Sequence, residues 1–240
     1  MPRWYAAITG GRNSTDVVLL EGLHPVKHAL RFGAIITHLA TWDRAGLASL
    51  ATALAPDVKE TLLALAVDVP LADASLLAPK GVPSPVIGVA ARPIVTVNDV
   101  LGATGPVIVC ENPRHFGNVG AVIRVAAAAG AGGVLIVGDA DPWHPTAVRA
   151  AAGLQFALPV ARCDELPETN RPIVALDGAG ETLNPGMLDD AVLLVVGTER
   201  AGVTQTLRDR AVQTVALPMR PGVSSLNLAT AVAAALYRGR

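Results

Sequence analysis

The sequence predicts an α/β protein with a parallel sheet in its carboxyl-terminal part, and three observations support this prediction. Between residues 106 and 240, short apolar runs alternate with segments of helical spacing, which is typical of parallel sheets covered by helices. The run at 192–197 is apolar on both faces, as expected for a central strand. The composition is 51% hydrophobic and 16% charged, so the 240-residue chain can bury a substantial core.

The first 95 residues are predicted to form a smaller α/β unit. Strands are expected at 17–20, 34–39 and 86–90, and helices at 22–31 and 45–54. The segments at 58–65 and 73–78 have no clear assignment. Residues 96–105 are predicted to be a linker, because they contain Gly102 and Gly105 and end before Pro106.

Residues 106–240 are predicted to form the second domain. Strands are expected at 107–110, 134–138, 173–177, 192–197 and 212–218, and helices at 117–129, 145–152 and 204–211. A final alanine-rich helix follows, with Ser224 or Ser225 as its expected N-cap. In such folds ligands bind at the carboxyl ends of the strands.

Charge and composition argue against several functional classes. The net charge is −1, which argues against binding nucleic acid by bulk charge, and aromatic residues make up only 3% of the chain. His24 and His28 lack a third ligand and have Pro25 between them, so no metal site is expected. Cys110 and Cys163 have no motif spacing and are expected to be reduced thiols of a cytoplasmic protein. Neither a signal peptide nor a membrane span is predicted.

Polar residues gather at the ends of three predicted strands, in residues 111–124, 197–202 and 216–228. Each segment also has an ordinary structural interpretation. Arg124 would then lie on a solvated helix face, Glu199 in a connecting loop, and Ser225 at a helix cap. No dinucleotide-binding glycine pattern, Walker A motif or nucleophile elbow occurs in the chain.

Taken together and in this order, the three segments resemble motifs of the SpoU/TrmH branch of the SPOUT RNA methyltransferases. The first is Asn118-Val-Gly-Ala-Val-Ile-Arg124, and the second is Gly197-Thr-Glu-Arg-Ala-Gly202. The third is Leu217-Pro-Met219 followed by Ser225-Leu-Asn-Leu228. The resemblance covers about residues 106–238, and the front unit resembles the family's substrate-binding domain more loosely. Val125, Ala151 and Ala229 stand where the family commonly has hydroxyl residues.

The resemblance implies a trefoil knot, in which the carboxyl-terminal helix is threaded through a loop, and a homodimer in which both chains build the site. General rules of chain topology would argue against a knot. The resemblance also implies an enzyme that transfers a methyl group from S-adenosylmethionine to a ribose 2′-hydroxyl of RNA. Ribosomal RNA is favoured over transfer RNA as the substrate.

The resemblance further implies two sets of site residues. The cofactor-binding set is Leu176, Gly197, Leu217, Met219 and Leu226. The catalytic set is Asn118, Arg124, Glu199, Ser225 and Asn227. The family assigns removal of the hydroxyl proton to Arg124. A guanidinium, whose pKa exceeds about 12, is better suited to binding phosphate and stabilising a developing alkoxide.

The front domain is expected to hold the RNA, with Lys27 and Arg31 on one helix face. Two other classes of protein remain open at this point. One is a non-catalytic RNA-binding relative with the same fold. The other, from strand and helix periodicity alone, is a doubly wound enzyme that binds a small molecule or a nucleotide.

Overall fold

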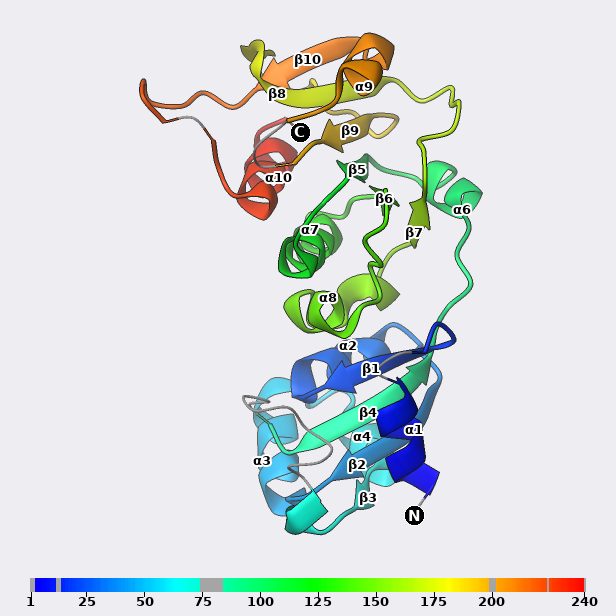
Figure 1. Cartoon of the computed structure of the whole chain (residues 1–240). Helices are drawn as coiled ribbons and strands as arrows, with labels where there is room; N and C mark the ends of the chain where they lie inside the picture. The colour runs from blue at the N-terminus through cyan, green and yellow to red at the C-terminus, as the bar shows by residue number, and fades with distance from the viewer. Residues whose placement is uncertain (1–2, 12–13, 74–83, 199–201, 224, 240) are drawn as a thin grey trace. The chain divides into compact units, whose positions relative to one another are not determined.

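The computed structural model describes residues 3–11, 14–73, 84–198, 202–223 and 225–239 (Figure 1). The chain forms two compact units. Unit 1 comprises Met1–Ile94 and Trp143–Ala157, and unit 2 comprises Val95–Pro142 and Leu158–Arg240. The division near residue 95 lies close to the predicted linker. The segment Trp143–Ala157 differs from expectation, because it was assigned to the second domain and packs with the first.

Unit 1 is built on a four-stranded sheet with the order β1-β4-β2-β3. Its strands are β1 (Val17–Glu21), β2 (Ile36–Thr41), β3 (Val67–Asp68) and β4 (Val86–Ala91). The central strand β4 is antiparallel to both β1 and β2, whereas β2 and β3 are parallel. The helices from the first part of the chain are α1 (Arg3–Gly11), α2 (Leu23–Arg31), α3 (Arg44–Leu54) and α4 (Lys59–Leu65). Sequence patterns did not predict α1.

The segment Trp143–Ala157 contains α8 (Pro145–Ala150) and the short 3₁₀ helix η1 (Leu154–Phe156), and it belongs to the core of unit 1. Trp143 and Phe156 stack edge to face with ring centroids 5.2 Å apart, and both join the cluster of buried residues around α2. A Cβ on Gly153 would lie 2.7 Å from the carbonyl oxygen of Pro25. This close packing explains why residues distant in sequence join the front unit.

Polar contacts also hold this segment. Arg149 forms an ion pair with the buried Glu21 at the end of β1, with Nη1 3.2 Å from Oε2. His28 of α2 places Nδ1 2.7 Å from the carbonyl oxygen of Ala152. Burial lowers the pKa of His28, and the charges of Lys27 and Arg31 lower it further.

Unit 2 is built on a six-stranded parallel sheet with the order β10-β8-β9-β5-β6-β7. Its strands are β5 (Val107–Glu111), β6 (Gly133–Val137), β7 (Val160–Cys163), β8 (Ile173–Thr182), β9 (Leu193–Val196) and β10 (Gln213–Ala216). The predicted parallel sheet is confirmed, and β9 lies inside it between β8 and β5. The short edge strand β7 was not predicted.

The helices of unit 2 are α6 (Val97–Leu101), α7 (Phe116–Ala128), α9 (Gln205–Arg210) and α10 (Leu228–Arg238). Helix α6 occupies the stretch predicted to be a linker, where Thr96 and Asp99 form a reciprocal capping box. Val100 of α6 and Leu207 of α9 belong to one buried cluster with residues of β5, β6 and β9. Helices α7 and α10 pack side by side (Figure 1).

Helix α10 begins differently from the prediction and ends against a loop that follows β8. Its N-cap is Asn227, whose Oδ1 accepts from the backbone N–H groups of Ala229 and Thr230, and not Ser225. At its other end, the carbonyl oxygen of Gly239 accepts hydrogen bonds from the backbone N–H groups of Gly186 and Leu188, at 2.9 and 3.0 Å. The end of α10 is therefore bound to the segment between β8 and β9.

Arg171 connects two loops of unit 2, the loop between α6 and β5 and the loop before β9. Its guanidinium donates to five backbone carbonyls, those of Leu101, Ala103, Gly105, Asp190 and Ala191. Because five carbonyls share one cation, the loop after α6 and the loop before β9 are fixed to each other.

Candidate active site

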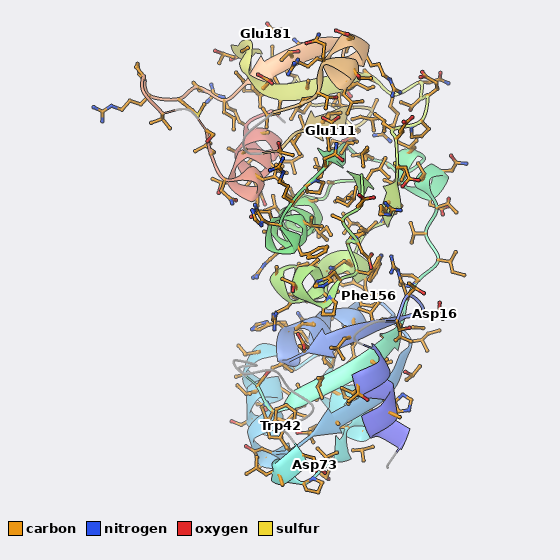
Figure 2. All side chains as sticks on the ribbon, in the orientation of Figure 1. Asp16, Trp42, Asp73, Glu111, Phe156 and Glu181 are labelled. Carbon is orange, nitrogen blue, oxygen red and sulfur yellow. The ribbon has the colours of Figure 1, made fainter. Side chains whose placement is uncertain are left out.

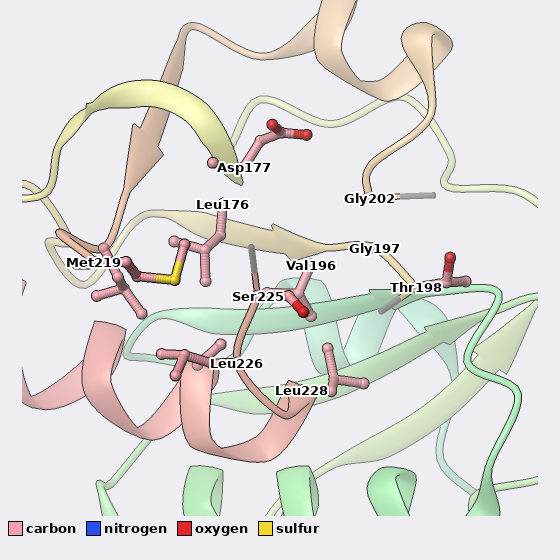
Figure 3. Close-up of a pocket in the computed structure, with 13 residues that line it drawn as sticks. Leu176, Asp177, Val196, Gly197, Thr198, Gly202, Met219, Ser225, Leu226 and Leu228 are labelled. Atoms are coloured by element: carbon pink, nitrogen blue, oxygen red, sulfur yellow. The ribbon is translucent and has the colours of Figure 1, made fainter. Parts of the chain in front are cut away.

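A cavity of about 360 Å³ opens at the carboxyl end of β9 and beside the middle of β8, and it is closed by the segment before α10 (Figure 3). Leu176 and Asp177 lie on one side of it, and Leu226 and Leu228 on the other. Five residues predicted to bind a cofactor line this cavity: Leu176, Gly197, Leu217, Met219 and Leu226. Ser225 lines it as well. The parallel sheet thus brings together residues from two of the three polar segments, as its topology requires.

The wall after β9 depends on Gly197. The backbone N–H of Gly202 donates to the carbonyl oxygen of Thr198 at 2.9 Å, so the chain turns back on itself directly after the strand. A Cβ on Gly197 would lie 1.8 Å from the carbonyl oxygen of Gly202. Only glycine permits this approach. Glu199 lies outside the described residues, so its catalytic role stays a prediction.

Two asparagines join the first and third polar segments. Nδ2 of Asn227 donates to Oδ1 of Asn118 at 3.1 Å. Asn118 lies in the first turn of α7, and Asn227 caps α10, so this hydrogen bond links the N-terminal ends of two neighbouring helices. The amide oxygen of Asn227 is occupied by capping, which leaves its amide nitrogen to hold Asn118. The structure therefore brings Asn118 and Asn227, two residues of the predicted catalytic set, into direct contact.

The buried carboxylate of Glu111 connects the first polar segment to the start of α9, which follows the second polar segment. Glu111, at the end of β5 (Figure 2), is 6% exposed. Its two oxygens accept from the backbone N–H and the hydroxyl of Thr204, at 2.8 and 2.6 Å. Thr204 is the N-cap of α9, directly after the turn that walls the cavity. Sequence reasoning gave Glu111 no role, although its place at a strand end within the first polar segment was a usable signal.

Asp177 is a second residue that sequence reasoning missed. Its side chain is 19% exposed and lines the cavity beside Leu176. Oδ1 accepts from the backbone N–H of Ala179 at 3.1 Å, and Oδ2 lies 3.4 Å from Nη1 of Arg208. The signal in the sequence was a carboxylate directly after an apolar run, at the carboxyl end of a predicted strand.

Arg124 lies on α7 among buried neighbours, but its own side chain is exposed. It forms no hydrogen bond or ion pair with any residue that the structure describes, and it is not part of the cavity wall. Its guanidinium is therefore available to a partner that approaches the surface of α7. This fits a cation that binds a substrate phosphate better than one that supports the fold.

Comparison with known proteins identifies the family. The model of the SpoU rRNA methylase family matches residues 105–237, which include all three polar segments. The chain belongs to the SpoU rRNA methylase family. The resemblance seen in the sequence is thereby confirmed.

Relatives of this SpoU-family chain have named activities. A 23S rRNA (uridine(2479)-2'-O)-methyltransferase of Streptomyces viridochromogenes is 30% identical, over 97% of this chain and 86% of the relative. The 23S rRNA (guanosine(2553)-2'-O)-methyltransferase RlmP of Bacillus subtilis is 27% identical, over 95% of this chain and 90% of the relative.

A solved structure is similar along nearly the whole chain. The SpoU methyltransferase AviRb from Streptomyces viridochromogenes, in complex with the cofactor AdoMet, has a TM-score of 0.74 and 26% identity. The match covers 98% of this chain and 94% of that one. The similarity therefore extends to the front unit of this SpoU-family chain as well as to its methyltransferase part.

Lys27 and Arg31 both have partners within unit 1, and their binding of RNA stays a prediction. Lys27 is only 9% exposed, and its Nζ donates to the carbonyl oxygen of Leu54 at 3.3 Å. Arg31 forms two hydrogen bonds of 2.6 Å with the carboxylate of Asp57, and these lower the pKa of Asp57. Helical spacing placed both cations on one face but did not show that the fold occupies them.

Two further findings concern the described residues only. They contain no group of three or more histidine, cysteine, aspartate or glutamate side chains that could hold a metal ion. None of their helices is long and apolar enough to cross a membrane.

Proposed function

We propose that this chain transfers the methyl group of S-adenosylmethionine to a ribose 2′-hydroxyl of ribosomal RNA. The observation that carries the proposal is the cavity beside β8 and the carboxyl end of β9, lined by residues of two family motifs. The family match and the rRNA 2'-O-methyltransferase names of the relatives support the same reaction.

The cavity fits the cofactor in size and chemistry. A volume of about 360 Å³ lies within the usual range for small-molecule sites. Leu176, Leu217 and Leu226 supply apolar walls for a purine ring, and the strand end at Gly197 supplies backbone groups for its edge. When bound, S-adenosylmethionine supplies an electrophilic methyl group, and the chain's task is to place the acceptor hydroxyl in line with it.

Positioning and charge are assigned to separate residues. The hydrogen-bonded pair of Asn118 and Asn227 is proposed to orient the ribose, with Ser225 beside it at the cavity. Arg124 is proposed to bind the neighbouring phosphate and to stabilise the alkoxide as its proton leaves. Glu199 is proposed to orient an arginine, either Arg124 or its counterpart in a second subunit.

The fold is proposed to contain a trefoil knot. The hydrogen bonds from the loop after β8 to Gly239, and from Arg238 Nε to the carbonyl oxygen of Leu183, support it. We also propose a homodimer that completes the site. Support comes from two large apolar side chains near α10, Val223 and Tyr237, which are 49% and 68% exposed.

RNA binding is proposed to involve cations around the cavity as well as unit 1. Arg114, Arg124 and Arg220 are exposed, and none forms an ion pair with a described residue. Arg114 precedes the first motif, Arg124 ends it, and Arg220 lies between the two parts of the third, so phosphates bound there would bring a ribose toward the cavity. Action in the cytoplasm is supported by the two free thiols, Cys110 and Cys163.

The test is transfer of labelled methyl groups from S-adenosylmethionine to ribosomal RNA, followed by mapping of the modified nucleotide. Arg124→Ala should abolish transfer, since the loss of an oxyanion-stabilising group costs roughly 10²- to 10³-fold in rate. Calorimetry should show cofactor binding unchanged, because Arg124 does not line the cavity.

Three outcomes would contradict the proposal. Transfer to transfer RNA alone would reassign the substrate. Cofactor binding without transfer to either RNA would favour a non-catalytic RNA-binding protein. Substantial transfer by Arg124→Ala would rule out a catalytic role for that residue.

A further inference from the structure

The cavity carries a negative charge. Among the described residues that line it, Asp177 is the only one with an ionisable side chain, and the rest are apolar, hydroxyl-bearing or glycine. Figure 3 places Asp177 beside Leu176 and across from Leu226. A ligand in this cavity therefore lies beside the Asp177 carboxylate.

The surrounding structure holds this carboxylate in place. The backbone N–H of Ala179 donates to Oδ1, and Arg208 approaches Oδ2 from outside the cavity wall. Arg208 also donates to the carbonyl oxygen of Val203 and to Oε1 of Gln205. The backbone of Ala179 and the guanidinium of Arg208 thus hold the carboxylate at the cavity wall, and Arg208 is itself engaged with the start of α9.

We propose that Asp177 makes the cavity prefer S-adenosylmethionine over S-adenosylhomocysteine, and that Arg208 limits the strength of this preference. The inference rests on the proposed function. In the transfer, the ribose oxygen forms a bond to the methyl carbon and the hydroxyl proton leaves to solvent. The sulfur keeps the electron pair of the broken S–C bond, so a sulfonium becomes a neutral thioether. The product therefore carries one positive charge fewer than the cofactor.

The dimensions of the site make this charge difference effective. A sulfonium bound in this cavity of about 360 Å³ shares it with the Asp177 carboxylate, and partly buried charges still interact at separations of roughly 10 Å. Because the attraction disappears with the methyl group, Asp177 strengthens cofactor binding without equally retaining the product. Product release often limits the rate of an enzyme, so a carboxylate that attracts the cofactor more than the product favours turnover.

The test is calorimetry of S-adenosylmethionine and S-adenosylhomocysteine with the whole chain and two variants. Asp177→Asn should weaken S-adenosylmethionine about threefold to tenfold and S-adenosylhomocysteine less than about twofold. Arg208→Gln should act in the opposite direction and raise the preference for the charged ligand. Opposite effects on the affinity ratio are not expected of a pair that only supports the fold.

Asp209→Asn is the matched control, because Asp209 lies on the same helix, is exposed, and does not line the cavity. It should leave the affinity ratio unchanged. The inference is wrong if both variants weaken both ligands equally, or if Asp209→Asn lowers the ratio as much as Asp177→Asn. If the unmodified chain binds neither ligand, the proposed function itself fails, which is a different result.

Discussion

At the scale of single residues, the site depends on backbone approach as much as on side chains. Gly197 contributes no side-chain chemistry, yet the turn after β9 can form only because a hydrogen atom stands where other residues carry a Cβ. Gly178 also lines the cavity, but a Cβ there would have no atom within 4 Å. The two glycines therefore form a natural comparison.

Gly197→Ala should weaken binding of S-adenosylmethionine by at least about tenfold and destabilise the chain by roughly 1–3 kcal/mol, because the turn must move away from the new methyl group. Gly178→Ala should change both quantities little. Calorimetry and thermal unfolding of the two variants measure this. Equal effects at the two positions would contradict the importance given to the Gly197–Gly202 approach.

At the scale of elements, Glu111 joins the end of β5 to the start of α9. Strand β5 leads into the motif that carries Asn118, and the segment before α9 includes the turn that walls the cavity. One buried carboxylate with two short hydrogen bonds thus sets the spacing between two motifs. A buried carboxylate is retained only where its oxygens are satisfied in this way.

Glu111→Ala should raise the KM for the cofactor about tenfold, since it leaves the partly buried backbone N–H of Thr204 without its acceptor, at a cost of roughly 1–2 kcal/mol. Glu111→Gln keeps one side-chain oxygen and should retain part of the affinity. Thr204→Val should add little to Glu111→Ala in a double-mutant cycle. Fully additive losses would show that the two residues act independently.

At the scale of the whole molecule, the sequence predicted the sheet of unit 2 but missed two parts of unit 1. These are helix α1 and the segment Trp143–Ala157. The parallel sheet of unit 2 followed from apolar runs such as that of β9, and the motif residues followed from the family resemblance. Local capping rules favoured Ser224 or Ser225, whereas Asn227 makes the cap and also bonds Asn118, a contact between distant parts of the chain. Asp177 with Arg208, and the burial of Lys27, are likewise set by tertiary packing that spacing does not encode.

The stability of unit 1 should depend on pH through His28. Burial holds the pKa of His28 below its usual 6.5, so the folded state favours the neutral ring. The stability that this contributes is fully present above pH 6.5 and is lost as the pH falls toward the lowered folded value. The melting temperature of the chain should therefore fall between pH 7 and pH 5.

His28→Gln should show less of this loss, because glutamine can bond the Ala152 carbonyl without titrating. His38→Gln, which changes a histidine elsewhere in unit 1, is the control and should follow the unmodified chain. Thermal unfolding across this pH range gives the answer. An identical pH profile for His28→Gln and the unmodified chain would remove His28 as the cause.

The placement of Trp143–Ala157 in unit 1 limits how members of this family can exchange parts. Cutting the chain after Ile94 does not separate a front domain, because α8 and η1 complete its core and Arg149 is the ion-pair partner of the buried Glu21. A chimera that takes residues 1–94 from one relative and the rest from another would pack the core of unit 1 against side chains of α8 and η1 that come from a different protein and do not fit it. An exchange of unit 1 between relatives would keep its core intact only if Trp143–Ala157 moves together with the amino-terminal part.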